Sequence, residues 1–289
     1  MTHVVILPYF CDEEVDRFVR IVRRMGEFPE SRCQWQFLLA ASPRIKPSQR
    51  LIRTCQRIAP TTSFRCPSQV FGYPQGPTAM FWDCMDYLHE HFPGDGGFNL
   101  WLESDMAPVK ADWIDRLDAE WQTHTDPWLM GCYVPKVYKS RLFRRRKLLL
   151  DDHVNGGACY ARHFARLMPA SAREGVFDVA VYAPARDQGK IVFTDQIDFS
   201  TNQRVRRDVL NPGKVLLHGF MQNKDRFVAD CLAPVTDQER RIARINPLLD
   251  SLESTRRKIR VWMVRRGHQA MYENMLLAKR RAGHSRRAA

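Results

Sequence analysis

Two carboxylates one residue apart follow an apolar run in the stretch LWLESDMAPV, residues 100–109. The apolar run predicts a buried strand that ends at the acids Glu103 and Asp105. Because side chains alternate along a strand, both carboxylates are expected on one side, with Ser104 on the other. Neighbouring carboxylates repel, and a hard divalent cation such as Mg²⁺ relieves that repulsion. The spacing therefore indicates a metal site, the alternative being one acid that caps the next helix and a second that is solvated.

The elements that must position these acids alternate between strands and helices. Strands are predicted at 3–10, 34–42, 61–67, 97–104, 127–134, 191–200 and 213–220, and helices at 11–28, 47–58, 77–91 and 109–122. Asp12 is a candidate N-cap of the first helix. This alternation is typical of an α/β fold with a mostly parallel sheet. We expect a catalytic domain over residues 1–233 and a basic helical extension over residues 234–289.

Over residues 3–225 the order of elements, together with the acid-x-acid motif, resembles the GT-A glycosyltransferases. That family has an Asp-x-Asp motif, so Glu103-Ser104-Asp105 departs from it at the first position and keeps the charge. The resemblance implies a GT-A-like Rossmann-type sheet, a bound Mn²⁺ or Mg²⁺, and a nucleotide-sugar donor, with a UDP-sugar expected. It implies Asp105 as a direct metal ligand, Glu103 beside the metal or the sugar, and His218 as a further ligand. Apart from the resemblance, a lone histidine such as His218 is more often structural.

The resemblance also assigns residues to the two substrates. On the donor side it places Pro8, Tyr9, Phe10, Gly72, Gly76, Ser104 and Lys224, and on the acceptor side Asn155, Gly156 and Gly157. Asp178 is the candidate general base, because inverting members use a carboxylate near this point of the chain. Asp195 and Asp198 are weaker rivals, and a plain helix-start role for Asp178 stays open. The stretch GYPQGP around Gly72 is alternatively an ordinary turn before a helix.

Positive charge is concentrated in two segments of this chain, which has a formal net charge of +13. Residues 136–147 carry +7 and residues 255–289 carry +10, which leaves −4 for the remainder. Such concentration indicates a polyanionic partner. The candidate nucleic-acid contacts are Lys136, Lys139, Arg141, Arg144, Arg145, Arg146, Lys147, Arg265 and Arg266. Among GT-A-like enzymes, the small, basic, phage-encoded type that glycosylates hydroxymethylated bases in DNA resembles this chain most, so double-stranded DNA is the expected partner.

Other functions remain open at this stage. An anionic membrane surface is an alternative partner, because RRKIRVWMVRR mixes apolar and basic residues; the acceptor would then be a lipid-linked or envelope glycan. A metal-dependent nuclease or a non-catalytic nucleic-acid-binding protein would also explain the charge. The eight cysteines lack CxxC spacing, which disfavours a zinc site and fits a reducing compartment. With no apolar run long enough to span a bilayer and no signal peptide, we expect a cytoplasmic protein, in the host cytoplasm if the chain is of phage origin.

Overall fold

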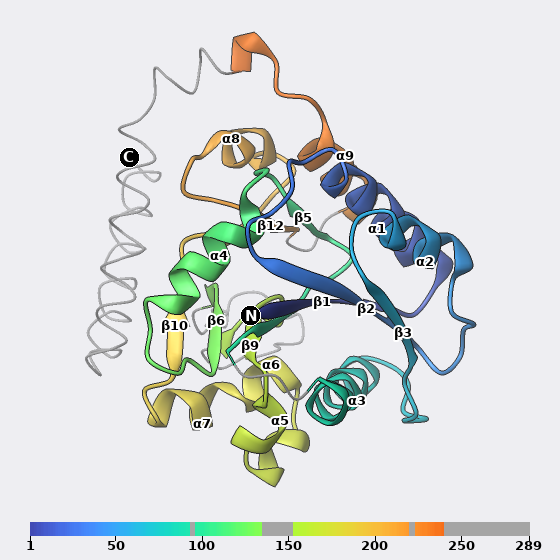
Figure 1. Cartoon of the computed structure of the whole chain (residues 1–289), viewed down its shortest axis with the longest axis vertical. Coiled ribbons are helices and arrows are strands. Elements are labelled where there is room, and N and C mark those ends of the chain that lie inside the picture. The colour runs from blue at the N-terminus through green and yellow to red at the C-terminus, as the bar shows by residue number, and fades with distance from the viewer. Residues whose placement is uncertain (93–95, 135–152, 220–222, 240–289) are drawn as a thin grey trace, which may run out of the picture. The chain divides into compact units, whose positions relative to one another are not determined.

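A seven-stranded sheet forms the centre of the computed structural model, which describes residues 1–92, 96–134, 153–219 and 223–239 (Figure 1). In spatial order its strands are β10 (Ile191–Phe193), β6 (Leu129–Gly131), β9 (Cys159–Ala161), β4 (Phe98–Trp101), β1 (Thr2–Tyr9), β2 (Gln34–Ala41) and β3 (Thr61–Arg65). Only β9 runs antiparallel to its two neighbours within this sheet. The predicted fold class, a mostly parallel sheet with flanking helices, is confirmed.

The central strands are apolar runs because both faces of the sheet are covered. In β1 every residue from His3 to Tyr9 is buried, and it pairs in parallel register with β2 from Thr2↔Gln34 to Tyr9↔Ala41. On its other edge β1 pairs with β4, where Ile6 lies beside Trp101. The carboxyl ends of β1 and β4 therefore lie side by side, which is where ligands bind in open α/β sheets.

Helices α1 (Asp12–Met25) and α2 (Gln49–Gln56) lie on one side of strands β1 to β3, and α3 (Gln75–His91) lies on the other (Figure 1). The apolar stripe of α1, which includes Phe18 and Val22, packs in the main core. On the α3 side, Phe81 makes aromatic contacts with Trp101, Tyr160 and Phe177. Such ring contacts hold α3 against strands β4 and β9 of the sheet.

The remaining elements form a second, smaller sheet, a two-stranded ribbon and further helices around the main sheet. A second sheet has the order β11 (Ile197–Ser200), β12 (Leu216–Gly219) and β5 (Met106–Pro108), and β7 (Tyr133–Val134) pairs with β8 (His153–Val154). The other helices are α4 (Trp113–Gln122), α5 (Phe164–Leu167), α6 (Phe177–Ala180), α7 (Tyr182–Asp187), α8 (Val205–Leu210) and α9 (Lys224–Leu232), with a 3₁₀ turn at Ala170–Arg173. Because β5 is antiparallel to β12, the residue after the acid motif, Met106, lies opposite His218.

Three local predictions differ from the structure. The single strand predicted at 191–200 is two strands, β10 and β11, which belong to different sheets. The N-cap of α1 is Cys11 rather than Asp12, and its side chain makes no capping bond. Instead Glu14, in the first turn, accepts a hydrogen bond from the backbone N–H of Phe10. The stretch 127–134 contains two strands, β6 and β7, separated by Cys132. At the start of α1, Glu14 takes part in a contact with the site rather than only in helix capping. At Cys132, the break in the strand lets β7 pair with β8 instead of continuing the main sheet.

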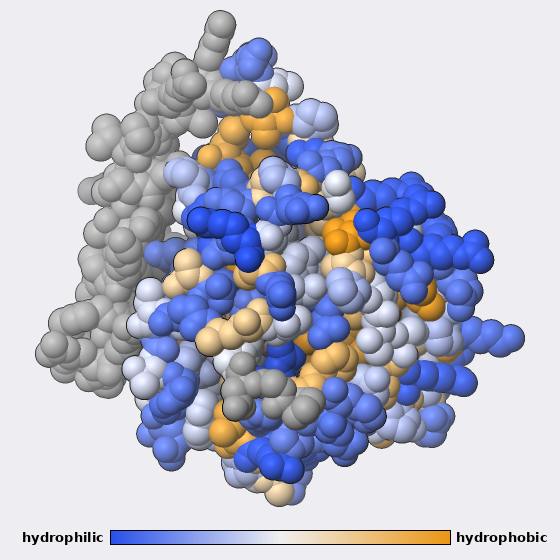
Figure 2. Space-filling view, viewed as in Figure 1, coloured by the Kyte–Doolittle hydropathy of each residue, from blue (hydrophilic) through white to orange (hydrophobic). Residues whose placement is uncertain are grey.

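The described chain continues past the predicted domain boundary at 233/234. The Arg206 guanidinium on α8 donates hydrogen bonds to the Glu239 carboxylate and to the Pro234 carbonyl. Residues 240–289, where the basic helical extension is expected, lie outside the described residues, so that boundary stays a prediction. No helix in the described ranges has the length and apolar character that crossing a membrane requires. On the face shown in Figure 2, hydrophilic residues predominate and apolar ones lie in small patches.

Candidate active site

The acid motif lies in a turn between two strands. Strand β4 ends at Trp101 and β5 begins at Met106, whose N–H donates to the Glu103 carbonyl over 2.9 Å. The turn sends the Ser104 hydroxyl toward α1, while the carboxylates of Glu103 and Asp105 converge on His218. The expected separation of the acids from Ser104 is therefore present, but it comes from the turn and not from strand alternation.

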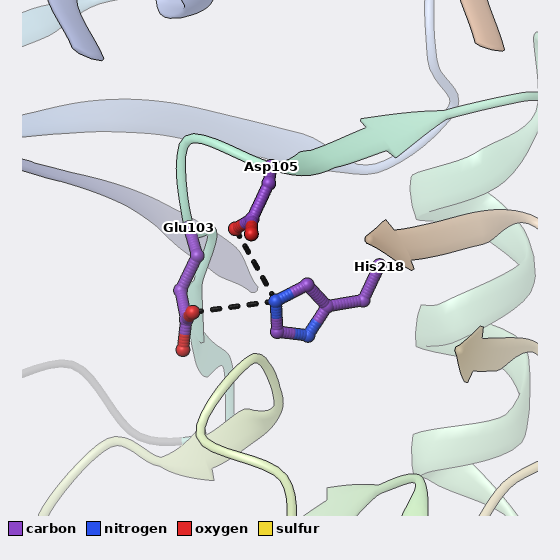
Figure 3. Close-up of side chains that lie close together, drawn as sticks. All are labelled: Glu103, Asp105 and His218. Carbon is purple, nitrogen blue, oxygen red and sulfur yellow. Dashed lines mark ion pairs between the residues drawn. The ribbon is translucent and has the colours of Figure 1, made fainter. Parts of the chain in front are cut away.

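His218 joins the two carboxylates into one cluster (Figure 3). Its Nε2 lies 3.3 Å from Glu103 Oε2 and 3.2 Å from Asp105 Oδ1. Its Nδ1 lies 2.7 Å from Asn155 Oδ1, which also accepts the N–H of Gly157. Because an amide oxygen can only accept a hydrogen bond, Nδ1 is the donor to Asn155 and carries a proton. The other ring nitrogen, Nε2, is the one that faces the acids. Orienting the imidazole through its second nitrogen is the arrangement found around metal-binding histidines.

Two cationic side chains, those of His218 and Lys224, lie beside the Asp105 carboxylate. Lys224, the first residue of α9, places Nζ 3.0 Å from Asp105 Oδ2. Burial favours a higher pKa for Asp105, but His218 and Lys224 overcome it and hold that pKa well below its usual range. Burial conversely favours a lower pKa for His218, but Glu103 and Asp105 overcome it and raise the pKa to about 10. A protonated imidazole and an ammonium thus occupy the electrostatic role that a divalent cation would take.

The cluster fits a divalent metal ion. One possible ligand atom from each of Glu103, Asp105 and His218 lies within 4.8 Å of the others, and across the described ranges no other group of three such side chains is this close. Asp105 Oδ1 is buried and has no hydrogen-bond partner, although it lies within ion-pair distance of the imidazole. Two carboxylate oxygens and one imidazole nitrogen suit Mn²⁺, and carboxylates suit Mg²⁺.

Helix α1 contacts the acid turn through the side chains of Glu14 and Arg17. The Glu14 carboxylate lies 3.4 Å from the Ser104 hydroxyl, and the buried Arg17 donates from Nε to the same hydroxyl over 3.3 Å. Arg17 also lies 3.6 Å from Asp225, the neighbour of Lys224, and Arg20 pairs with Asp225 at 2.5 Å. Because Glu14 and Arg17 are three residues apart, one face of α1 reaches both the acid turn and α9. Burial raises the pKa of Glu14, although the hydrogen bond from the Phe10 N–H opposes that effect.

A cavity of about 380 Å³ opens beside the cluster. Its lining residues are Pro8, Phe10, Glu14, Tyr73, Pro74, Pro77, Trp101, Glu103, Ser104, Asp105, Asn155, Val176, Phe177, Asp178 and Lys224. It therefore brings together eight of the residues that the sequence assigned to metal, donor, acceptor or catalysis. A second hollow, of about 670 Å³, lies at the opposite ends of β1 and β2 and contains none of them.

Three predicted donor residues do not line the cavity. The Tyr9 side chain is fully buried, and its hydroxyl accepts the backbone N–H of Ser48. Gly72 has a φ of +82° and open space around it, so it supplies a left-handed turn. Gly76 lies in the first turn of α3 against the backbone of Phe71. The loop does reach the cavity, but through Tyr73 and its neighbouring prolines.

Asp178 faces the cavity from the first turn of α6. One of its oxygens, Oδ1, is buried with no hydrogen-bond partner, and the other lies 3.8 Å from His153 Nε2. Burial, followed by repulsion from Glu103, raises the pKa of Asp178, while His153 opposes the rise. Of the rival acids, Asp198 forms an ion pair with Lys214 at 2.8 Å, and neither Asp198 nor Asp195 lines the cavity.

The two acceptor-side glycines are required by close packing. A Cβ on Gly156 would lie 2.6 Å from Phe177 Cζ and 3.1 Å from Glu103 Oε1. A Cβ on Gly157 would lie 2.1 Å from the Met106 sulfur. These contacts press the loop after β8 between the acid turn and α6. A side chain at either position would have to displace Phe177 or Met106, so the glycines let the loop pack closely between the acid turn and α6.

Several cavity residues were not predicted from the sequence, namely Glu14, Tyr73, Trp101 and Phe177. His153, which contacts Asp178, was not predicted either. Glu14 resembled an ordinary first-turn acid, and the aromatics resembled core residues. Only Tyr73 had a usable signal, since it lies in the Gly/Pro loop already assigned to the donor. All the candidate nucleic-acid contacts lie outside the described residues: Lys136, Lys139, Arg141, Arg144, Arg145, Arg146, Lys147, Arg265 and Arg266.

Comparisons with known proteins give distant structural likenesses. No protein-family model matches the sequence, and a search of curated proteins gives no match. A solved 4-diphosphocytidyl-2C-methyl-D-erythritol synthase is 8% identical over 80% of this chain and 97% of its own, with a TM-score of 0.47. The S. aureus TarS fragment 1–349, in complex with UDP-GlcNAc, is 10% identical over 77% of this chain and 60% of its own, with a TM-score of 0.45. The galactosyltransferase LgtC, in complex with donor and acceptor sugar analogs, is 12% identical over 83% of this chain and 99% of its own, also with a TM-score of 0.45.

Proposed function

We propose that this protein is a metal-dependent glycosyltransferase that moves a sugar from a nucleotide diphosphate to a hydroxyl acceptor. The observation that carries the proposal is the cluster of Glu103, Asp105 and His218, with His218 Nε2 directed at both carboxylates. It lies at the carboxyl ends of parallel strands, beside a cavity that also contains a lysine and a further buried acid. A fold alone does not establish an activity, so the proposal rests on this site.

Mn²⁺ or Mg²⁺ held by these three side chains would neutralise the diphosphate of the donor as it leaves. Lys224, which pairs with Asp105, is half exposed and would turn its ammonium to a phosphate oxygen. Pro8, the last residue but one of β1, and Phe10, which follows the strand, line the cavity beside the acid turn and would contact the base. A UDP-sugar remains the expected donor.

Asp178 would act as the general base. It would take the proton of the acceptor hydroxyl while that oxygen bonds to the sugar carbon and the bond from this carbon to the diphosphate breaks. Its raised pKa suits a base that must hold a proton during the reaction. Gly156 and Gly157 would keep this carboxylate close to the metal cluster.

For the acceptor we propose a hydroxymethylated base in double-stranded DNA, with a glycan at a membrane surface as the alternative. Both hypotheses are supported by the basic segments 136–147 and 255–289. A base in a duplex would have to be flipped out to enter the cavity. A cytoplasmic location and a domain boundary near residue 233 complete the proposal.

A transfer panel tests the function directly. Full-length protein with Mn²⁺ would be incubated with each common nucleotide sugar and with duplex DNA that contains 5-hydroxymethylcytosine or 5-hydroxymethyluracil. We expect one donor to release its nucleoside diphosphate and mass spectrometry to find a sugar-sized gain on the modified base. Diphosphate release without modified DNA would move the acceptor to a glycan.

Two results would overturn the glycosyltransferase proposal. The first is an absence of turnover for every donor. The second is DNA cleavage that needs metal but no nucleotide sugar, which would indicate a nuclease. Asp105→Asn serves as the inactive control, and Asp16→Asn, which changes an exposed acid paired with Arg50, serves as the matched active control.

A further inference from the structure

The exposed aromatic Tyr73 stands at the mouth of the cavity. Among the described residues, the large hydrophobic side chains left exposed are Met1, Val70 and Tyr73, and Tyr73 is the most exposed at 76%. It is also the one of the three that lines the cavity. Isolated exposed hydrophobic residues are common, but an aromatic ring at the opening of a polar cavity is typical of a ligand-binding site.

The wall that carries Tyr73 is joined to the Asp178 side of the cavity. Tyr73 precedes α3, and the Thr78 hydroxyl in the first turns of α3 lies 3.4 Å from the backbone N–H of Phe177, next to Asp178. Phe177 stacks on Phe81 of the same helix with ring centroids 4.2 Å apart. Although most of the Tyr73 side chain is exposed, partial desolvation of its phenol raises the pKa, and the negative charges of Asp178 and Glu103 add to this rise. Tyr73 therefore lies on the side of the proposed acceptor.

The charges around the cavity select against an anionic acceptor. Four carboxylates line it, those of Glu14, Glu103, Asp105 and Asp178, against the single ammonium of Lys224. A bound divalent cation and the doubly charged diphosphate of a nucleotide-sugar donor cancel each other in charge, so the excess of carboxylates remains when the acceptor enters. A phosphate or carboxylate on the acceptor would meet like charges at short range. Hydroxyl groups, in contrast, can donate hydrogen bonds to these carboxylates.

We infer that Tyr73 is a specificity residue of the acceptor subsite, on which an uncharged, hydroxyl-bearing ring stacks so that its hydroxyl reaches Asp178. This inference rests on the proposed glycosyltransferase function. The ring is a flipped-out hydroxymethylpyrimidine or a neutral sugar, and both present a flat or apolar face to an aromatic side chain. On a polyanionic acceptor the phosphates would remain outside the cavity.

The test compares Tyr73→Ala with Tyr73→Phe in the full-length protein. Because Tyr73 is exposed, neither change should disturb folding, and urea unfolding would check this. With the donor identified by the transfer panel, we expect Tyr73→Ala to raise the acceptor KM by about tenfold, the loss typical of one stacking contact. Tyr73→Phe, which keeps the ring, should stay within about threefold of wild type. Hydrolysis of the donor by water and the Kd of Mn²⁺–UDP should change less than the acceptor KM in both variants.

Pairs of neutral and charged acceptors test whether the acceptor must be uncharged. They also distinguish a pyrimidine base from a sugar as the acceptor ring. The panel pairs 5-hydroxymethyluracil with 5-hydroxymethylorotate, which carries a carboxylate on the ring itself, and methyl glucoside with methyl glucoside 6-phosphate. Each neutral member that is accepted should exceed its charged partner at least tenfold in kcat/KM, and the pair that reacts identifies the ring as a base or a sugar.

Opposite results overturn the inference. Equal use of neutral and charged acceptors would remove the charge argument. A tenfold weaker Mn²⁺–UDP complex in Tyr73→Ala, with the acceptor KM unchanged, would move Tyr73 to the donor side. If wild type hydrolyses no donor, the proposed function itself fails; if it hydrolyses donor and Tyr73→Ala transfers normally, only this inference fails.

Discussion

The two sides of the cavity differ in how completely their charged groups are partnered. On the metal side, each Asp105 oxygen has a cationic side chain within ion-pair distance, Oδ1 that of His218 and Oδ2 that of Lys224, and Arg17 links the acid turn to α9. On the acceptor side, one Asp178 oxygen is buried without a hydrogen-bond partner, and Tyr73 is largely exposed. The charged groups of the metal side are thus preorganised for a divalent cation. The acceptor side has a polar atom without a hydrogen bond, which the acceptor hydroxyl would satisfy. Substitutions on the two sides should therefore have separable effects.

The largest effect is expected from Asp105→Asn. Removing this charge while keeping the shape should abolish tight Mn²⁺ binding and lower kcat/KM for transfer by about a thousandfold, or roughly 4 kcal/mol. Titration calorimetry with Mn²⁺ and a transfer assay would measure the two quantities. Asp16→Asn should leave both unchanged. Unaltered metal affinity in Asp105→Asn would remove the metal assignment.

Asp178→Asn tests the other side. We expect a loss of about a hundredfold in kcat with Mn²⁺ affinity preserved, because a general base contributes to the chemical step and not to the metal. A base must be deprotonated, so wild-type activity should fall as the pH drops through the pKa of Asp178, which lies above the ordinary aspartate value. The acid limb of the pH profile of kcat/KM should disappear in the variant. An unchanged profile would exclude Asp178 as the base.

Arg17→Met would loosen the metal side without touching a proposed ligand. The variant keeps the aliphatic bulk but removes the donor to Ser104 and the contact with Asp225. Loss of such a supporting contact should weaken Mn²⁺ binding by about tenfold, with the acceptor KM unchanged. Arg20→Met is the matched control, because Arg20 also contacts Asp225 but makes no bond to Ser104. Equal metal affinity in the two variants would show that the brace at Ser104 has no role.

The smallest effect on activity is expected from Gly156→Ala, which changes the spacing between the two sides. The added methyl would overlap the Phe177 ring and should lower the free energy of unfolding by about 1–3 kcal/mol, with a loss of a few fold in transfer. A double variant with Phe177→Leu should recover part of the stability, which urea denaturation would measure. No recovery would mean that the clash is relieved elsewhere.

Much of the framework was predictable from sequence because it depends on local patterns. The apolar runs of β1, β2 and β4 and the stripe of α1 mark buried elements directly. Glu103 and Asp105 stood out because two acids ending an apolar run need a reason to be there. His218, Asp178 and Lys224 came from the family resemblance, since neither their spacing nor their neighbours in sequence marks them.

The sequence by itself determined the order of strands and helices from β1 to β4, the position of the acid pair, and the sites where charge is concentrated. These features depend on residues close together in the chain. Tertiary structure alone decided that His218 faces both acids across β5 and β12, that Tyr9 turns into the core while Tyr73 reaches the cavity, and that Glu14 and Arg17 brace Ser104. Each of these depends on contacts between residues far apart in sequence, which form only when the sheet brings their strands and helices together.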